Sequence, residues 1–245
     1  MSRWKAAGIH LSISIAIGLV AALLIFGLWY PPPYSRATGA LELVVLLMGV
    51  DLTLGPLLTL AVFKSGKKGM AFDLAVIAVL QASAFLYGSS VVVRARPVYI
   101  VGAIDRFSVV AASDLERADL AKAAPPFNRV SWTGPQLVGV VIPDDPETRN
   151  DLVFGSLGGK DIESMPQHYR PYTDVAPAML KRAKPLAALR KAHPESAPQL
   201  DAWLHGHARA EASVVTLPIV GHNDATMLLD AETGAPLDAI AVDPW

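Results

Sequence analysis

Four residues inside the long apolar runs of this 245-residue chain are the first candidates for a functional site. Asp51, Gly55 and Pro56 share one run, and Gln81 lies near the middle of the next. A charged aspartate at the centre of a bilayer costs about 2.5–3.5 kcal/mol, so Asp51 must face protein or be protonated. Three roles fit it: a hydrogen bond to Gln81 that joins two helices, contact with a partner helix, or proton or ion transport. The hydrogen bond is favoured, because transport needs several polar residues in a line.

A Gly-Pro pair follows Asp51 by one helical turn. Pro56 lacks a backbone donor, so we expect it to kink the helix and to expose a carbonyl near Leu52. Thr53 and Thr59 are the side chains predicted to satisfy the freed groups.

Three apolar runs of 22, 25 and 22 residues carry these candidates, at about 9–30, 39–63 and 72–93. At about 1.5 Å per residue, each run is long enough to form a transmembrane helix. The first run is longer than the apolar part of a signal peptide and ends in Trp-Tyr-Pro instead of small residues, so we predict that it is retained. It also carries small residues four apart, a spacing that permits close helix packing: Ser14, Gly18 and Ala22.

Lysine and arginine in the short loops predict the orientation of these helices. The N-terminal tail has two, residues 31–38 have one and residues 64–70 have three. The positive-inside rule therefore places the N-terminus in the cytoplasm and everything after Val93 outside. Arg94 and Arg96 oppose this rule but are outnumbered, two against five.

Charge and composition indicate two domains. Residues 1–96 carry eight basic and three acidic residues, a net charge of +5, whereas residues 97–245 carry 13 and 19, a net charge of −6. We predict a membrane domain over residues 1–95 and a periplasmic α+β domain over residues 96–245. The chain has 52% hydrophobic residues, a net charge of −1 and no cysteine, which excludes disulfides and thiol catalysis and gives no sign of nucleic-acid binding.

The second domain alternates short strand and helix patterns. Its β-branched and aromatic stretches predict strands at 98–104, 107–111, 136–142, 214–220, 226–230 and 237–242. Cap and proline signals predict helices at 113–124 (a capping box of Ser113 and Glu116), 145–157, 174–191 with a break at Pro185, and 196–203 (Ser196 as the cap).

No residue pattern points to catalysis, a cofactor or a metal. Sequence signatures of nucleophilic hydrolases, zinc proteases and phosphate-binding loops are missing. His205 and His207 would share one face of a strand but diverge on a helix, and solvated surface histidines are the favoured interpretation. We therefore expect a protein that is not an enzyme.

Twelve residues from Gly49 to Leu60, Gly-Val-Asp-Leu-Thr-Leu-Gly-Pro-Leu-Leu-Thr-Leu, resemble the signature of the TfpX/TfpZ family of type IV pilin accessory proteins. Other stretches agree in order along nearly the whole chain: 5–12, 29–31, 72–74, 96–99, 105–107 and 242–245.

The resemblance implies an inner-membrane protein that helps a type IV pilin, major or minor, to accumulate or to assemble into pili. Its partners would be that pilin, other assembly components and membrane lipid. A pilin is held in the inner membrane by an apolar N-terminal helix, with its head outside, so chaperone-like contact along the three helices is a compatible hypothesis. The closing hairpin also resembles sensor domains of the PAS/Cache type, and the alternative is therefore a membrane-anchored ligand sensor that signals through a partner.

Overall fold

The computed structural model describes residues 2–31, 34, 38–143, 145–146 and 161–245. It divides the chain into two compact units: Met1–Leu28 with Ala40–Ala95, and Trp29–Gly39 with Arg96–Trp245. The chain passes from the first unit to the second between Ala95 and Arg96, and Trp29–Gly39 is grouped with the second unit.

Three helices of the first unit are long and apolar enough to cross a membrane. They are α1 (Arg3–Leu24), which continues as the π-helix η1 (Ile25–Trp29), α3 (Ala40–Val62) and α4 (Met70–Ala95). Helix α1 begins six residues before the predicted start, because the Ser2 hydroxyl accepts a hydrogen bond from the Lys5 backbone at 3.2 Å and caps the helix.

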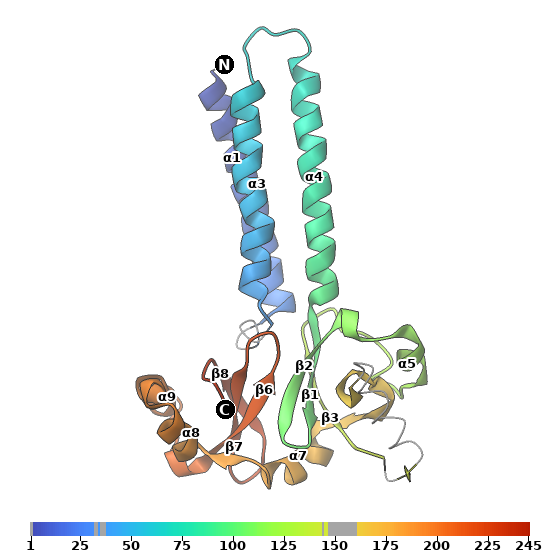
Figure 1. Ribbon diagram of the computed structural model, residues 1–245, viewed down its shortest axis with the longest axis vertical. Coiled ribbons are helices and arrows are strands. Elements are labelled where there is room, and N and C mark those ends of the chain that lie inside the picture. The colour runs from blue at the N-terminus through green and yellow to red at the C-terminus, as the bar shows by residue number, and fades with distance from the viewer. Residues whose placement is uncertain (1, 32–33, 35–37, 144, 147–160) are drawn as a thin grey trace. The chain divides into compact units, whose positions relative to one another are not determined.

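Helix α3 packs against both α1 and α4 (Figure 1). Of the three small residues on α1, Ser14 and Gly18 are buried and Ala22 is half-buried, and a Cβ on Gly18 would overlap the Met48 side chain of α3. The absence of a side chain at Gly18 therefore allows α1 and α3 to approach closely.

The second unit is built on one mixed sheet of eight strands, in the order β4-β3-β1-β2-β6-β7-β8 with β5 also paired to β6. The strands are β1 (Pro97–Ala103), β2 (Arg106–Ala111), β3 (Gln136–Val140), β4 (Tyr169–Pro171), β5 (Lys184–Pro185), β6 (Val214–Val220), β7 (Ala225–Asp230) and β8 (Pro236–Ile240). Antiparallel pairing dominates, but β1 pairs with β3 and β2 with β6 in parallel. The membrane helices and this α+β domain agree with the fold class expected from the sequence.

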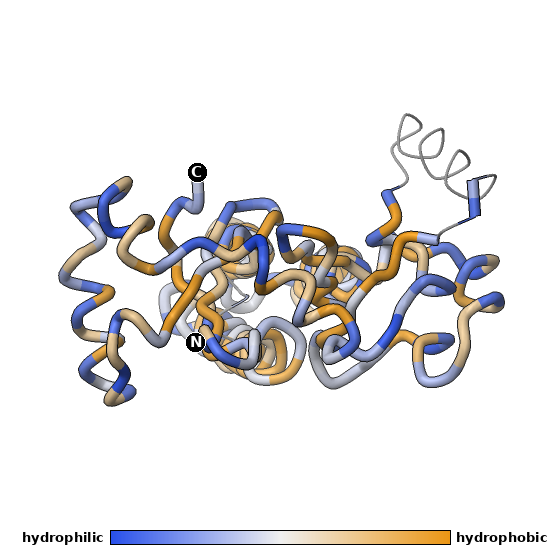
Figure 2. Tube along the Cα trace, turned by 90° about the horizontal axis from the view of Figure 1, so that it is seen from below, coloured by the Kyte–Doolittle hydropathy of each residue, from blue (hydrophilic) through white to orange (hydrophobic). Residues whose placement is uncertain are grey.

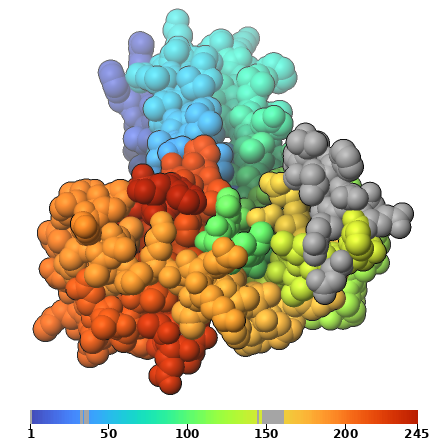
Figure 3. All heavy atoms as spheres, turned by 60° about the horizontal axis from the view of Figure 1, so that its bottom comes forward, coloured from blue at the N-terminus to red at the C-terminus, as the bar shows by residue number. Residues whose placement is uncertain are grey.

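Helices cover both faces of the sheet. Helix α7 (Tyr172–Leu180) packs on the face that carries Ile100, Leu217 and Met227. Helices α8 (Leu186–Ala192) and α9 (Ala197–Gly206) cover the other face of β6–β8. In Figure 2, hydrophilic and hydrophobic residues alternate along α8 and α9, at the left of that view, as is typical of helices with one buried side. Figure 3 shows the same helices in orange beside the red closing hairpin.

Neither of the two predicted helix caps forms. Ser113 lies in a 3-10 turn, η2 (Ala112–Asp114), where Asp114 accepts a hydrogen bond from the Ala111 backbone at 2.8 Å, and helix α5 (Arg117–Lys122) begins only afterwards. Helix α9 does begin directly after Ser196, as predicted, but the Ser196 hydroxyl donates to the His193 carbonyl instead of capping the helix.

The other two predicted helices have different outcomes. The stretch 174–191 divides into α7 and α8 around β5, which includes Pro185, so the predicted break is confirmed. The predicted helix at 145–157 lies almost entirely outside the described residues.

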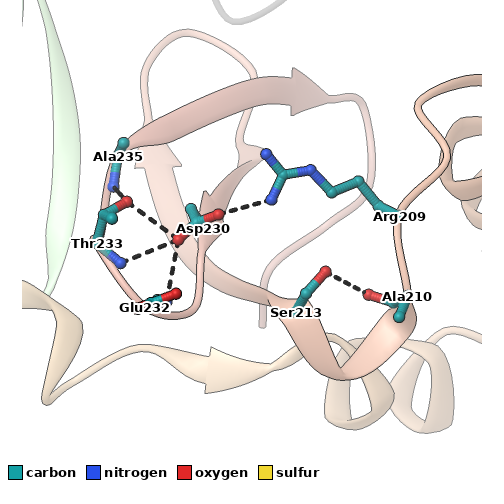
Figure 4. A network of polar contacts seen from close by, with 7 residues as sticks. All are labelled: Arg209, Ala210, Ser213, Asp230, Glu232, Thr233 and Ala235. Carbon is teal, nitrogen blue, oxygen red and sulfur yellow. Dashed lines mark hydrogen bonds and ion pairs between the residues drawn. The ribbon is translucent and has the colours of Figure 1, made fainter.

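The closing hairpin is held by the Asp230 carboxylate at the end of β7 (Figure 4). One oxygen accepts hydrogen bonds from Glu232 N, Thr233 N and Thr233 Oγ1 at 3.1, 2.9 and 3.0 Å, and the other pairs with Arg209 at 2.6 Å. The Arg209 guanidinium and the donors of the turn hold the pKa of Asp230 well below its usual range.

The turn is also tied to α7. Gly234 has φ +69°, a conformation that favours glycine, and its carbonyl accepts a hydrogen bond from the Tyr172 hydroxyl at 2.8 Å. Burial raises the pKa of Tyr172 to about 12, so the phenol remains a donor at neutral pH.

Replacing Asp230 with alanine should lower the thermal unfolding midpoint of the second unit by several degrees at pH 7. Because its pKa is lower in the folded state, the stabilisation is present above the unfolded pKa of about 3.9 and is lost as the pH falls towards the folded pKa. The difference between variant and parent should therefore shrink below about pH 4. Thermal unfolding of both proteins in detergent, followed by near-UV circular dichroism, measures the difference between their midpoints.

Glu232→Ala is the matched control, because Glu232 contributes its backbone N–H to this network. Equal losses in the two variants at pH 7 would contradict the role given to the Asp230 carboxylate.

Ile104 occupies an unfavourable position in the two-residue connection between β1 and β2. It has φ +56° and is 53% exposed. For an L-residue with a Cβ, and above all a β-branched one, this conformation costs about 1–2 kcal/mol.

Ile104→Gly should therefore raise the free energy of unfolding by roughly 1 kcal/mol, the backbone gain being partly offset by the entropy of glycine in the unfolded chain. Ile104→Ala removes the exposed apolar surface but keeps the Cβ, so it should gain little. Thermal unfolding in detergent distinguishes the two. If alanine stabilises as much as glycine, the cost lies in the side chain and not in the backbone.

Candidate functional site

Asp51 is the twelfth of the 23 residues of α3, the midpoint of the helix. The structure places Gln81 of α4 beside it: the Gln81 amide donates to the Asp51 main-chain oxygen at 3.4 Å. At this depth a bilayer offers no water to either group, so each needs a partner in the protein. The two residues expected to meet are thus adjacent, and Gln81 lies within hydrogen-bond reach of both the main-chain oxygen and the carboxyl group of Asp51.

Gly55 provides the space for this contact. It is buried, and a Cβ built on it would overlap the side-chain amide of Gln81. Gly49 on the same helix has no neighbour within 4 Å of such a Cβ. Gly55 therefore belongs to the packing of α3 against α4, and its face is not open to another helix.

Pro56 lies inside α3, which continues for six residues beyond it. The predicted relief of the freed carbonyl by the two threonines is wrong. Thr53 Oγ1 donates to the Gly49 carbonyl at 2.6 Å, and Thr59 Oγ1 is bonded to His10 Nδ1 of α1 at 2.6 Å.

The His10–Thr59 hydrogen bond is a contact that the sequence analysis missed. Thr59 is 2% exposed, and the bond joins α1 to α3 across 49 residues of sequence. Matching the depth of polar residues on neighbouring antiparallel helices, as was done for Asp51 and Gln81, would have found it.

A groove of about 260 Å³ opens between α3 and α4 on the side of Asp51 away from Gly55. Its lining residues are apolar except for Asp51 and Tyr87, and Leu43 and Val92 lie towards the end away from Asp51. On α3 the lining residues follow a spacing of three and four, which is one helix face: Leu43, Leu46, Leu47, Val50 and Asp51. Asp51 thus borders both the Gln81 contact and the groove.

Arg96, the first residue after α4, has a structural role in the second unit. It is 5% exposed, its guanidinium lies 4.1 Å from the centre of the Trp132 ring, and it donates to the Ser131 carbonyl at 3.3 Å. Burial lowers its pKa, and the aromatic face compensates the desolvated cation. This contact gives a reason for an arginine that opposes the positive-inside rule.

The histidine pair is not arranged as two ligands on a strand. His205 lies in the last turn of α9, and the His207 ring stacks on Trp203 at 4.4 Å while its Nδ1 contacts the Trp203 carbonyl at 2.8 Å. Within the described residues, no three histidine or acidic side chains form a group that could hold a metal.

The packing around Gly55 predicts the outcome of a substitution. Gly55→Leu should destabilise the helix unit by about 1–3 kcal/mol through overpacking, and should lower both the amount of protein in the membrane and its thermal stability in detergent. Gly49→Leu is the control, because its Cβ meets open space. Equal behaviour of the two variants would mean that α3 and α4 do not approach at Gly55.

Comparison with known proteins places the chain among fimbrial assembly proteins. The family model of the fimbrial assembly protein FimB matches residues 1–39. Two fimbrial assembly proteins of Dichelobacter nodosus, serogroups I and E1, are 35% and 34% identical over 185 residues, which is 75% of this chain and 72% of theirs. A third, of serogroups C1 and C2, is 36% identical over 121 residues, 49% of this chain and 92% of its own. No solved structure matches significantly. With this identity over most of both chains, the protein belongs to the fimbrial assembly protein (FimB) family.

Proposed function

We propose that this protein is a non-enzymatic accessory factor of the bacterial inner membrane that holds a type IV pilin before the pilin enters the pilus. Its N-terminus lies in the cytoplasm and its second unit in the periplasm. The protein binds the apolar helix of the pilin within the membrane and keeps the pilin available for assembly.

The observation that carries this proposal is the combination of a membrane-length helix unit with a separately folded unit, in a chain whose relatives are named for fimbrial assembly. A pilin, with an apolar helix in the membrane and a head outside it, has the same two-part layout. The loop charges support the orientation, since five of the six lysines and arginines in the tail and the two loops fall on the proposed cytoplasmic side.

The hairpin that suggested a ligand sensor does not favour that alternative. Its acid-then-Thr-Gly pattern is accounted for by the Asp230 network and by the positive φ of Gly234, both of which stabilise the turn itself. The pattern therefore needs no ligand to explain it.

Asp51→Ala should lower the amount of pilin recovered from cells several-fold while the accessory protein itself accumulates normally. The reason is that the carboxyl group meets the client, whereas the hydrogen bond from the Gln81 amide to the Asp51 main-chain oxygen is retained by alanine. Quantitative immunoblots of both proteins, together with surface pili counts, measure this effect.

Asp51→Asn serves as the companion variant, because an amide keeps the hydrogen-bonding capacity and removes the charge. Rescue by asparagine would assign the role to hydrogen bonding. Loss of the accessory protein together with the pilin would mean that Asp51 serves only to stabilise the fold. Normal pilin levels in Asp51→Ala would mean that Asp51 has no part in binding the client.

A further inference from the structure

The two seams of the helix unit differ. Along the α1–α3 seam, Gly18 admits the Met48 side chain and His10 bonds Thr59. The α3–α4 seam is in contact at two levels, Gln81 with Asp51 and Gly88 with Leu47, but it leaves the groove of about 260 Å³ beside them. The most apolar windows of α1, α3 and α4 are buried to 17%, 22% and 11% within the protein, so all three helices expose apolar surface. The groove is a hollow in this surface that Asp51 borders.

The groove has a defined length, and Asp51 lies at one of its ends. On α3 it extends from Leu43 to Asp51, eight helical steps or about 12 Å of helix axis, which corresponds to roughly two turns of a helix lying alongside. Ala84 lines it on α4, and because the antiparallel contacts pair 51 with 81 and 47 with 88, Ala84 lies opposite the stretch just before Asp51. A small residue there keeps the floor of the groove open.

We infer that this groove is the seat of one transmembrane helix of the pilin client, an inference that rests on the function proposed above. The occupant is apolar over about two turns and carries a hydrogen-bond donor at mid-bilayer depth, where it meets the Asp51 side chain. Lipid chains can fill the apolar part of the groove, but they bring no donor to the carboxyl group, which can accept further hydrogen bonds besides that of Gln81. Shape and polarity together therefore fit a helix better than lipid.

Photocrosslinking in living cells tests the location without repacking the protein. A photoreactive residue at Leu46 lies in the groove, and one at Leu57 on the same helix lies outside it, with similar exposures of 70% and 60%. We expect the pilin to be trapped at Leu46 several-fold more than at Leu57. Equal trapping, or trapping of a second copy of this chain at Leu46, would overturn the assignment of the groove.

A matched pair of substitutions tests whether the groove must be open. Ala84→Leu fills it, whereas Ala82→Leu makes the same change at an exposed position of α4 that is not part of its lining. Ala84→Leu should reduce both pilin recovery and the Leu46 crosslink several-fold, with the accessory protein at its normal level in both variants. Equal pilin recovery in the two variants would refute the inference.

A third probe distinguishes failure of this inference from failure of the proposed function. A photoreactive residue at the exposed Trp245 of the second unit reports contact with the pilin outside the groove. Pilin trapped there but not at Leu46 would reject the groove and leave the accessory function standing. If deletion of the whole gene leaves pilin levels and pili unchanged and no probe traps pilin, both fail.

Discussion

Two hydrogen bonds across the central helix of the membrane unit set its arrangement. Thr59 of α3 forms a hydrogen bond with His10 of α1, and the Asp51 main-chain oxygen of α3 accepts one from Gln81 of α4. In hydrocarbon an unsatisfied polar group costs several kcal/mol, and apolar surface gives no preference for helix over lipid. Polar contacts and small residues therefore determine which helices meet. Here they make α3 the shared partner of both neighbours, and they leave a groove on the side of α4 where such contacts end.

The second unit meets its constraint differently, by covering its sheet. Strand β1 is buried along its whole length, and β7 is buried at every position except Asp230. Since both faces of these strands are covered, they are continuous apolar runs without alternation. The two halves of the sheet join through a short parallel pairing of β2 with β6, at Phe107–Ile219 and Ser108–Val220. That pairing unites segments more than one hundred residues apart in sequence.

The sequence predicted most of the regular elements because their signals are local. Apolar length identified the three membrane helices, and β-branched runs located the strands, β6 with the observed limits. What it missed depends on distant residues: the two- and three-residue strands β5 and β4, which are defined by their neighbours, and the His10–Thr59 bond. The cap predicted at Ser113 failed because the chain forms a 3-10 turn there, in which Asp114 accepts a hydrogen bond from the Ala111 backbone, and α5 begins only at Arg117. The equal depth of Asp51 and Gln81 in the bilayer predicted that the two residues would be neighbours. Depth alone does not predict that the Gln81 amide donates to the Asp51 main-chain oxygen.

The position of Asp51 at the midpoint of α3 has a consequence for how the chain enters the membrane. A residue at the exact centre of a span lies at the same depth whichever end of the helix enters first, so the cost of its carboxyl group does not distinguish the two orientations. Asp51 therefore does not influence which orientation the helices adopt in the membrane. The choice is left to the basic loops and to the folding of the second unit, and substitutions at Asp51 can be interpreted without the concern that they invert the protein.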